Sequence, residues 1–106
     1  MPKRSNQFQK IVTYIAEQLA PSGATVRESV ELPESGVSGV LREVDTLIEV
    51  DAGLTRVRIA VESRERSRKD DIQWVDHLIG KYALLPIDRV LAVSNAGFST
   101  AAKLPR

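Results

Sequence analysis

The residues of this sequence best suited to chemistry are two carboxylates, Asp45 and Glu62, which flank an Asp51-Ala52-Gly53-Leu54 turn. A hairpin about this turn pairs positions whose numbers sum to 107, so Asp45 lies directly opposite Glu62. Opposed Cβ atoms are roughly 4.5–5.5 Å apart, where like charges cost about 0.2–1 kcal/mol. A shared Mg²⁺ ion would reverse that sign, because Mg²⁺ is typically held by one or two carboxylates plus water and phosphate oxygens. The alternative is a pair of solvated acids on an exposed sheet face.

The rest of the hairpin is complementary in the same register. One face is almost wholly apolar and consists of the pairs Val50/Val57, Ile48/Ile59 and Thr46/Val61. The other face carries the pairs Asp51/Arg56, Glu49/Arg58, Leu47/Ala60, Asp45/Glu62 and Glu43/Arg64. Three of these five pairs have opposite charges, which leaves Asp45 and Glu62 as the one repulsive pair.

Length and composition indicate one small domain over residues 1–106, with 42% hydrophobic and 27% charged residues. The absence of cysteine excludes disulfides, thiolate zinc sites and cysteine nucleophiles, and a single histidine excludes most histidine-rich metal sites. No apolar leader or membrane-length apolar run is present, so we expect a cytoplasmic protein with no membrane contact and no small-molecule cofactor.

Positive charge is concentrated at one place although the net charge is only +1. Arg64, Arg66, Arg68 and Lys69 fall within six residues, directly after the third expected strand. A short basic loop is more often a solvated connection than a phosphate site, unless a neighbouring site gives it a purpose.

These residues are positioned by elements expected in the order α-β-β-β-α-β, followed by a short terminal helix. The first helix covers residues 5–19, capped by Ser5 or Asn6, and its apolar residues recur every three or four positions. Three strands follow at 24–32, 40–50 and 55–63. A second helix begins after its cap Asp70 and runs to Tyr82, and an apolar run at 89–94 predicts a central strand covered on both faces.

Two residues of the second helix have competing interpretations. Trp74 lies off the centre of the apolar stripe, and we interpret it as packing at the sheet edge or a partner surface rather than as a base-stacking platform. His77 lies on the polar side, where a surface histidine is a simpler interpretation than a catalytic base.

Three segments occur in order on these elements: Ser35-Gly36-Val37-Ser38-Gly39 leading into Arg42-Glu43-Val44-Asp45, then Val61-Glu62-Ser63-Arg64-Glu65, then Val93-Ser94-Asn95-Ala96-Gly97-Phe98-Ser99. Together with the order of elements, they resemble the PD-(D/E)xK nuclease superfamily, most closely its Mrr-like restriction endonuclease branch. The resemblance covers most of the chain and implies an α/β (α+β) restriction-endonuclease-like fold, with a central mixed sheet flanked by helices.

The resemblance implies a Mg²⁺ site in which Mn²⁺ can substitute. Asp45 and Glu62 would bind the metal, with the Ser63 carbonyl oxygen as a further ligand. DNA is the implied substrate, and we expect a homodimer because one small active site cuts one strand at a time. Arg66, Arg68 and Lys69 would then lie near the DNA backbone, where cationic contacts give affinity with little sequence information.

The chain departs from the family pattern at two positions. Arg64 occupies the usual lysine position, and a guanidinium can stabilise phosphate charge but cannot act as a general base. Lys69 or Lys81 could supply an amine instead. The first helix has Gln9 after Phe8 where relatives often carry glutamate, and a neutral Gln9 could still orient a metal-bound water.

Three hypotheses follow from these residues. The first is a Mg²⁺-dependent DNA endonuclease of restriction or repair type, in which Asp45, Glu62 and Arg64 act together. The second is a nuclease-fold domain that has lost catalysis through Arg64 and acts in DNA binding or assembly. The third treats the charged sheet face as ordinary pairing in an interaction module. No base-reading motif is present, so target choice would come from elsewhere, and the chain can be a module of a longer protein.

Overall fold

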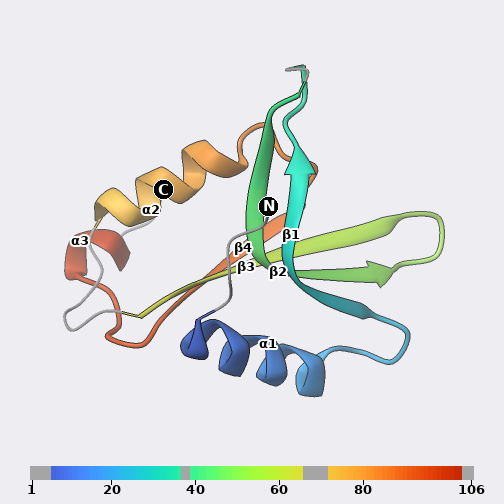
Figure 1. Ribbon diagram of the computed structural model, residues 1–106, viewed down its shortest axis with the longest axis horizontal. Helices are drawn as coiled ribbons and strands as arrows, with labels where there is room; N and C mark the ends of the chain where they lie inside the picture. The colour runs from blue at the N-terminus through green and yellow to red at the C-terminus, as the bar shows by residue number, and fades with distance from the viewer. Residues whose placement is uncertain (1–5, 37–38, 66–71, 104–106) are drawn as a thin grey trace.

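The computed structural model describes residues 6–36, 39–65 and 72–103. Its elements are α1 (Gln7–Leu19), β1 (Thr25–Pro33), β2 (Leu41–Asp51), β3 (Arg56–Arg64), α2 (Ile72–Tyr82), β4 (Arg89–Ser94) and α3 (Thr100–Lys103). Figure 1 shows the two longer helices beside a strongly bent sheet. The expected α+β class and element order are confirmed. The expected cap Asp70 lies outside the described residues.

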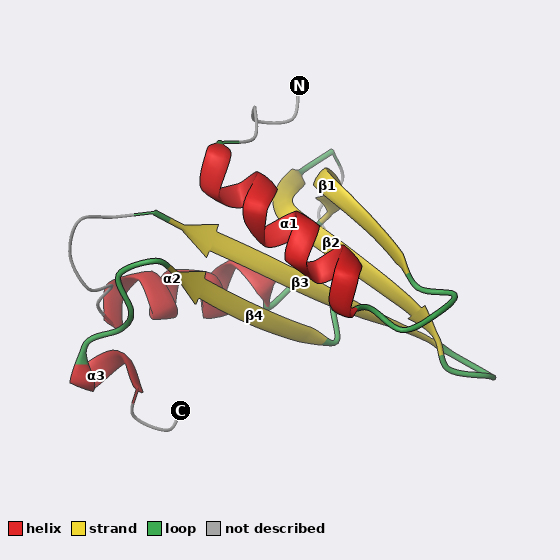
Figure 2. Cartoon of the chain, turned by 90° about the horizontal axis from the view of Figure 1, so that it is seen from below, coloured by secondary structure: helices red, strands yellow, loops and turns green. Residues whose placement is uncertain are grey.

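Helix α1 begins where the sequence predicts. Asn6 has extended backbone geometry, and its Oδ1 accepts a hydrogen bond from the Gln9 N–H at 2.7 Å, which satisfies one free donor of the first turn. The buried face of the helix includes Val12 and Thr13, and the Thr13 hydroxyl lies 2.7 Å from that of Thr46 on β2. Helix α1 therefore packs across one face of the sheet (Figure 2).

The sheet has the strand order β1-β2-β3-β4, with β4 parallel to β3 and the other pairs antiparallel. The expected central position of β4 is wrong, because β4 is an edge strand of the sheet that the structure describes. Val90 and Leu91 are 37% and 52% exposed. The apolar run of β4 still contacts both faces of the sheet: Leu91 and Val93 line a groove under α1, whereas Ala92 packs against the core beneath α2.

The β2–β3 ladder follows the predicted register from Asp51/Arg56 to Thr46/Val61. It ends there, so the expected ladder pairs Asp45/Glu62 and Glu43/Arg64 are not formed. Beyond Thr46, β2 turns away from β3, and the Glu62–Arg64 end of β3 pairs in register with β4 alone.

The core lies between α2 and the sheet. It contains Val44, Leu47, Ala60, Trp74, Leu78, Tyr82 and Leu85. The hairpin face that carries the charge pairs is therefore largely covered, and the interpretation of Asp45 and Glu62 as solvated acids on an exposed face is wrong.

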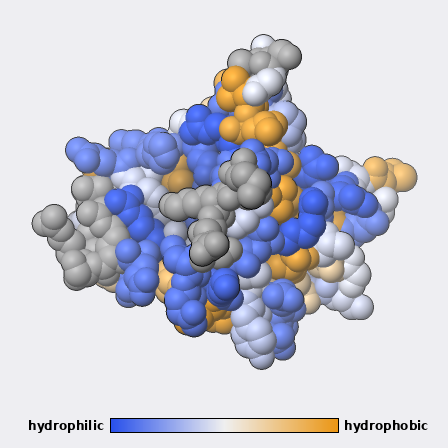
Figure 3. All heavy atoms as spheres, viewed as in Figure 1, coloured by the Kyte–Doolittle hydropathy of each residue, from blue (hydrophilic) through white to orange (hydrophobic). Residues whose placement is uncertain are grey.

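At the far end of the hairpin, the predicted Glu49/Arg58 pair is part of a larger ion-pair network. The buried Glu49 carboxylate lies 2.9 Å from Arg27, 3.0 Å from Arg58 and 3.9 Å from Arg56. Figure 3 shows a mainly hydrophilic face with hydrophobic atoms at the tip of the β2–β3 turn, where Leu54 is fully exposed. None of the described helices is long and apolar enough to cross a membrane.

Candidate functional site

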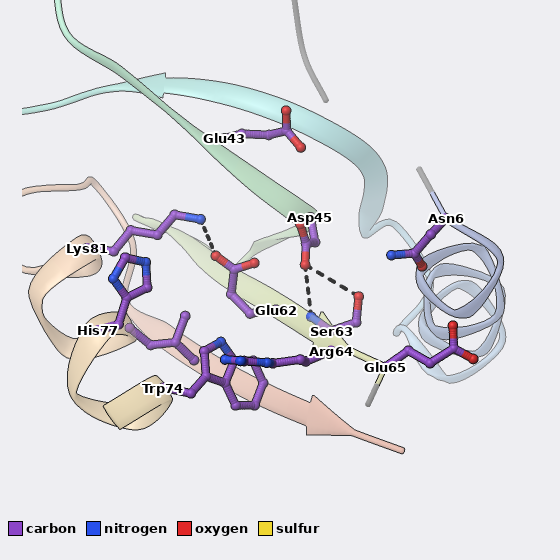
Figure 4. Close-up of a pocket in the computed structure, with 11 residues that line it drawn as sticks. Asn6, Glu43, Asp45, Glu62, Ser63, Arg64, Glu65, Trp74, His77 and Lys81 are labelled. Carbon is purple, nitrogen blue, oxygen red and sulfur yellow. Dashed lines mark hydrogen bonds and ion pairs between the residues drawn. The ribbon is translucent and has the colours of Figure 1, made fainter. Parts of the chain in front are cut away.

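An open cleft of about 590 Å³ lies where β2 and β3 part, with α2 along one side. Its lining residues are Asn6, Glu43, Asp45, Glu62, Ser63, Arg64, Glu65, Trp74, His77, Leu78 and Lys81. Figure 4 shows Asp45 and Glu62 facing one another inside it, with Lys81 and His77 on the α2 side. The structure thus brings together the two carboxylates and Arg64, as the sequence predicts.

The cleft forms where β1 and β2 bend together, at Ser29 of β1 and Asp45 of β2. The β1–β2 ladder pairs Glu28 with Thr46 and Val30 with Val44, but its register skips Ser29 and Asp45 between them. Ser29 has φ 56°, a left-handed conformation that is uncommon for residues other than glycine. The bend carries the start of β2 away from β3 and leaves a gap between their backbones (Figure 1).

Asp45 spans this gap with its side chain. Its Oδ2 accepts a hydrogen bond from the Ser63 N–H at 2.9 Å and a longer one from the Ser63 hydroxyl at 3.4 Å. A carboxylate therefore takes the place of the backbone carbonyl that a continued ladder would offer to β3. This contact fixes the Asp45 carboxylate in the cleft.

Glu62 is 5% exposed, which is rare for a carboxylate without partners. Its Oε1 accepts hydrogen bonds from the Tyr82 hydroxyl at 2.8 Å and from Lys81 Nζ. Its other oxygen lies on the side of Asp45 (Figure 4). The last residues of α2 therefore hold one oxygen of Glu62, while the other is directed to the second carboxylate.

The environment raises the pKa of Glu62 from 4.5 to about 7. Burial is the largest cause, and the hydrogen-bonding contact and charge of Asp45 add to it, whereas Lys81 opposes the change. Burial and the Glu62 charge also raise the pKa of Tyr82, so its hydroxyl remains a donor to Glu62. The repulsion expected between Asp45 and Glu62 is therefore present, although the two residues are not a ladder pair.

Arg64 is held on the rim of the cleft by aromatic packing. Its guanidinium carbon lies 5.3 Å from the centroid of a Trp74 ring, within the range of a cation–π interaction. The Trp74 ring in turn stacks on Phe98, with centroids 5.8 Å apart and an interplanar angle of 9°. Trp74 is a buried core residue, which agrees with the expected packing role, and it also lines the cleft.

The donor set of the cleft suits a hard divalent cation. Two carboxylates converge, one with its pKa raised by burial and then by the other, and a shared cation would relieve their repulsion. Among the described residues, no group of three or more carboxylate, imidazole or thiol side chains could hold a metal ion. Mg²⁺ commonly retains several waters and does not require such a group. Glu43 stands apart from the pair in Figure 4.

Gln9 lies behind this site rather than in it. It is 4% exposed, and its Nε2 donates to the Asp45 backbone oxygen at 3.2 Å and to Ser29 Oγ at 3.1 Å. Gln9 is not among the residues lining the cleft, so these contacts do not support its expected role on a metal-bound water. His77 is exposed at the rim, as expected.

The expected backbone-binding residues Arg66, Arg68 and Lys69 lie outside the described residues. Of the two lysines considered as substitutes for the missing lysine, the structure therefore places only Lys81, which contacts Glu62 directly. The role of the Ser63 carbonyl oxygen as a metal ligand stays a prediction. The Ser63 N–H and hydroxyl instead bind Asp45.

Sequence reasoning missed the roles of Tyr82 and Ser29. Tyr82 belongs to the apolar stripe of α2, and nothing in that periodicity shows that its hydroxyl reaches a carboxylate on β3. Its position beside Lys81, both at the end of a helix that crosses β3, is the available signal. Ser29 carries no signal, because left-handed positions are usually marked by glycine or asparagine.

No family model matches the sequence, and no curated protein matches it. A solved structure of similar fold is that of AF1548, a protein of unknown function, with a TM-score of 0.70 at 16% sequence identity. The alignment covers 92% of this chain and 52% of that one, so the chain spans about half the length of AF1548. At this identity the similarity shows a shared α+β fold, with a mixed four-stranded sheet between helices.

Proposed function

We propose that this chain is a Mg²⁺-dependent endonuclease domain that hydrolyses DNA phosphodiester bonds, of restriction or repair type. One observation carries the proposal: Asp45, Glu62 and Lys81 converge in a single open cleft, with the Arg64 guanidinium on its rim. The resemblance to PD-(D/E)xK nucleases supports the same assignment through the order of the residues in the sequence.

Asp45 and Glu62 would hold the metal. When bound, Mg²⁺ would polarise the scissile phosphate and lower the pKa of a water molecule. Asp45 is already fixed by Ser63, and Glu62 by Tyr82, so little reorganisation would accompany binding. Mn²⁺ would substitute because it favours the same oxygen ligands.

Lys81 and Arg64 would stabilise the negative charge that develops on the phosphate. Lys81 supplies the amine that the end of β3 lacks, since position 64 is arginine. Arg64 can bind phosphate oxygens through two parallel N–H groups, and the Trp74 ring restricts its orientation. Division of the usual lysine role between two residues is therefore part of the proposal.

DNA is the proposed partner, and a homodimer is proposed because cutting both strands needs two such sites. The basic residues Arg66, Arg68 and Lys69 follow directly after β3 and would bind backbone phosphates beside the cleft. A cytoplasmic location fits the cysteine-free sequence.

The test is cleavage of plasmid DNA by the purified chain with Mg²⁺ or Mn²⁺. Asp45→Asn and Glu62→Gln should each abolish cleavage, and Lys81→Ala should lower its rate by at least tenfold. Glu17→Gln, which changes an exposed acid on α1, is the matched control and should cut as the wild type does. Cleavage retained by both carboxylate variants would refute the site.

The second candidate function is a nuclease-fold domain without catalysis that acts in DNA binding or assembly. The Lys81–Glu62 ion pair favours it, because an amine on a metal ligand competes with the metal. This candidate predicts salt-sensitive DNA binding with no cleavage under any divalent ion. A gain of cleavage in Arg64→Lys would support it, and a loss of existing activity in that variant would show that arginine is the working residue.

A further inference from the structure

We infer that Gln9 and Ser29 are positioning residues that build the bend of β2 and thereby set the Asp45 carboxylate in the cleft. The consequence of this inference for catalysis rests on the proposed function. Its structural basis is the set of contacts between α1, β1 and β2. Neither residue lines the cleft, so both would act through Asp45.

The first observation is that Ser29, a residue in a strained backbone conformation, lies opposite Asp45, a ligand of the proposed metal site. Ser29 is the one residue other than glycine with positive φ among those described, and the register places it opposite Asp45. The ladder resumes on both sides, with Glu28/Thr46 and Val30/Val44. A left-handed serine in a strand is retained only where its surroundings stabilise it.

The second observation identifies what stabilises it. The Gln9 side-chain amide has two N–H groups, and its Nε2 donates to one acceptor on each strand: Ser29 Oγ and the Asp45 carbonyl oxygen. Both bonds are formed by a side chain that is 4% exposed, where an unsatisfied acceptor would be costly. Gln9 is itself anchored, because its backbone N–H donates to the cap residue Asn6.

These contacts give a continuous path from α1 to Asp45 in the cleft, which Asn6 at the start of α1 also lines. Gln9 and Ser29 hold the Asp45 peptide out of the regular ladder, and β2 leaves β3 at the same level. The Ser63 N–H then meets the Asp45 carboxylate at 2.9 Å. The orientation of Asp45 is therefore fixed from both sides, by its carbonyl oxygen and by its carboxylate.

The chemistry explains why an amide suits position 9. An ionised glutamate has no donors: it could accept from the Ser29 hydroxyl, but it would direct negative charge at the Asp45 carbonyl oxygen, which can only accept. The structure therefore predicts that Gln9→Glu disturbs the site. A role on a metal-bound water predicts the reverse, since an added carboxylate would strengthen a cation site.

The experiment uses the whole chain and two readouts, one of them independent of metal. The first is the ¹H–¹⁵N resonance of the Ser63 amide in metal-free protein, which reports its hydrogen bond to Asp45. The second is the affinity for Mn²⁺, measured by calorimetry. Gln9→Glu and Gln9→Leu should move the Ser63 resonance upfield and weaken Mn²⁺ binding by about 10- to 100-fold, as for other residues that orient metal ligands. Ser29→Ala, a milder change, should act in the same direction.

Thr13→Val is the matched control. It removes the buried hydrogen bond between Thr13 and Thr46, in the same α1–β2 interface and one residue along β2 from Asp45. It should lower stability while leaving the Ser63 resonance and Mn²⁺ affinity unchanged. An unchanged Ser63 resonance in the Gln9 variants, or an equal shift in Thr13→Val, would overturn the inference. Failure of the wild type to bind Mn²⁺ would overturn the proposed metal site, and the Ser63 resonance would still decide the positioning role.

Discussion

Glu62 should make the stability of the metal-free protein fall as pH rises. Its pKa is about 7 in the folded chain against an ordinary value of 4.5, so the folded state binds a proton more tightly than the unfolded state. The resulting stabilisation is complete below the unfolded pKa and is lost as pH rises through the folded pKa. At about 1.4 kcal/mol per pH unit, the difference corresponds to roughly 3 kcal/mol, most of which is lost between pH 5 and pH 8.

The assay is urea unfolding in EDTA at several pH values, for the wild type and for Glu62→Gln. The amide of the variant does not ionise, so the difference in unfolding free energy between the two proteins isolates Glu62 from the other carboxylates. Relative to the variant, the wild type should lose roughly 2–3 kcal/mol between pH 5 and pH 8. Glu17→Gln, on the exposed face of α1, should follow the wild-type profile.

Parallel profiles for the wild type and Glu62→Gln would refute this reasoning. They would mean that Lys81 and Tyr82 compensate the buried charge fully, so that Asp45 and Glu62 could both be ionised at neutral pH without cost. The electrostatic argument for a cation between the two carboxylates would then fail, whatever the protein does to DNA.

Three further predictions concern metal binding, the Glu49 ion pairs and the bend at Ser29. At pH 8, Mg²⁺ at ten times its dissociation constant should raise the unfolding free energy of the wild type by about 1.4 kcal/mol, with no effect on Glu62→Gln, as measured by urea unfolding. Glu49→Gln should destabilise the chain by about 1–2 kcal/mol in the same assay, because three guanidinium groups lose their buried carboxylate. Glu34→Gln, which affects the ion pair with Arg42, is the control and should cost less than about 0.5 kcal/mol. Ser29→Val should lower the unfolding free energy by more than about 1 kcal/mol, because a β-branched residue resists positive φ. Ser29→Gly should be nearly neutral, since relief of strain offsets the lost hydroxyl contact. A valine variant as stable as the wild type would contradict the described backbone.

The sequence predicted the hairpin register because side-chain alternation and turn position leave little freedom. Val50/Val57 and Glu49/Arg58 are paired as the arithmetic required, and moving either strand by one residue would have reversed both faces. The same reasoning extended the ladder too far, to Asp45/Glu62 and Glu43/Arg64. Its assumption of regular strands fails at Ser29, whose residue type gives no indication of a left-handed backbone.

Contacts made by long side chains were the other feature that the sequence did not predict. Helical spacing placed Tyr82 in the apolar stripe of α2, and the structure confirms that its ring is buried. The spacing does not show which group the Tyr82 hydroxyl contacts, because this depends on how α2 packs on the sheet. Likewise, an apolar run at 89–94 indicates partial burial without distinguishing a central strand from an edge strand. That position depends on whether a further strand pairs with β4.

The site depends on the interruption of the ladder at Ser29 and Asp45 rather than on the regular part of the sheet. Had the hairpin continued through Asp45 and Glu62, backbone hydrogen bonds would have closed the space between β2 and β3, and the Ser63 N–H would be directed at a carbonyl group. The bend at Ser29 and Asp45 leaves that donor to a carboxylate and opens the space in which Glu62 meets Lys81. The proximity of Asp45 and Glu62 therefore depends on this departure from the ladder and not on the ladder itself.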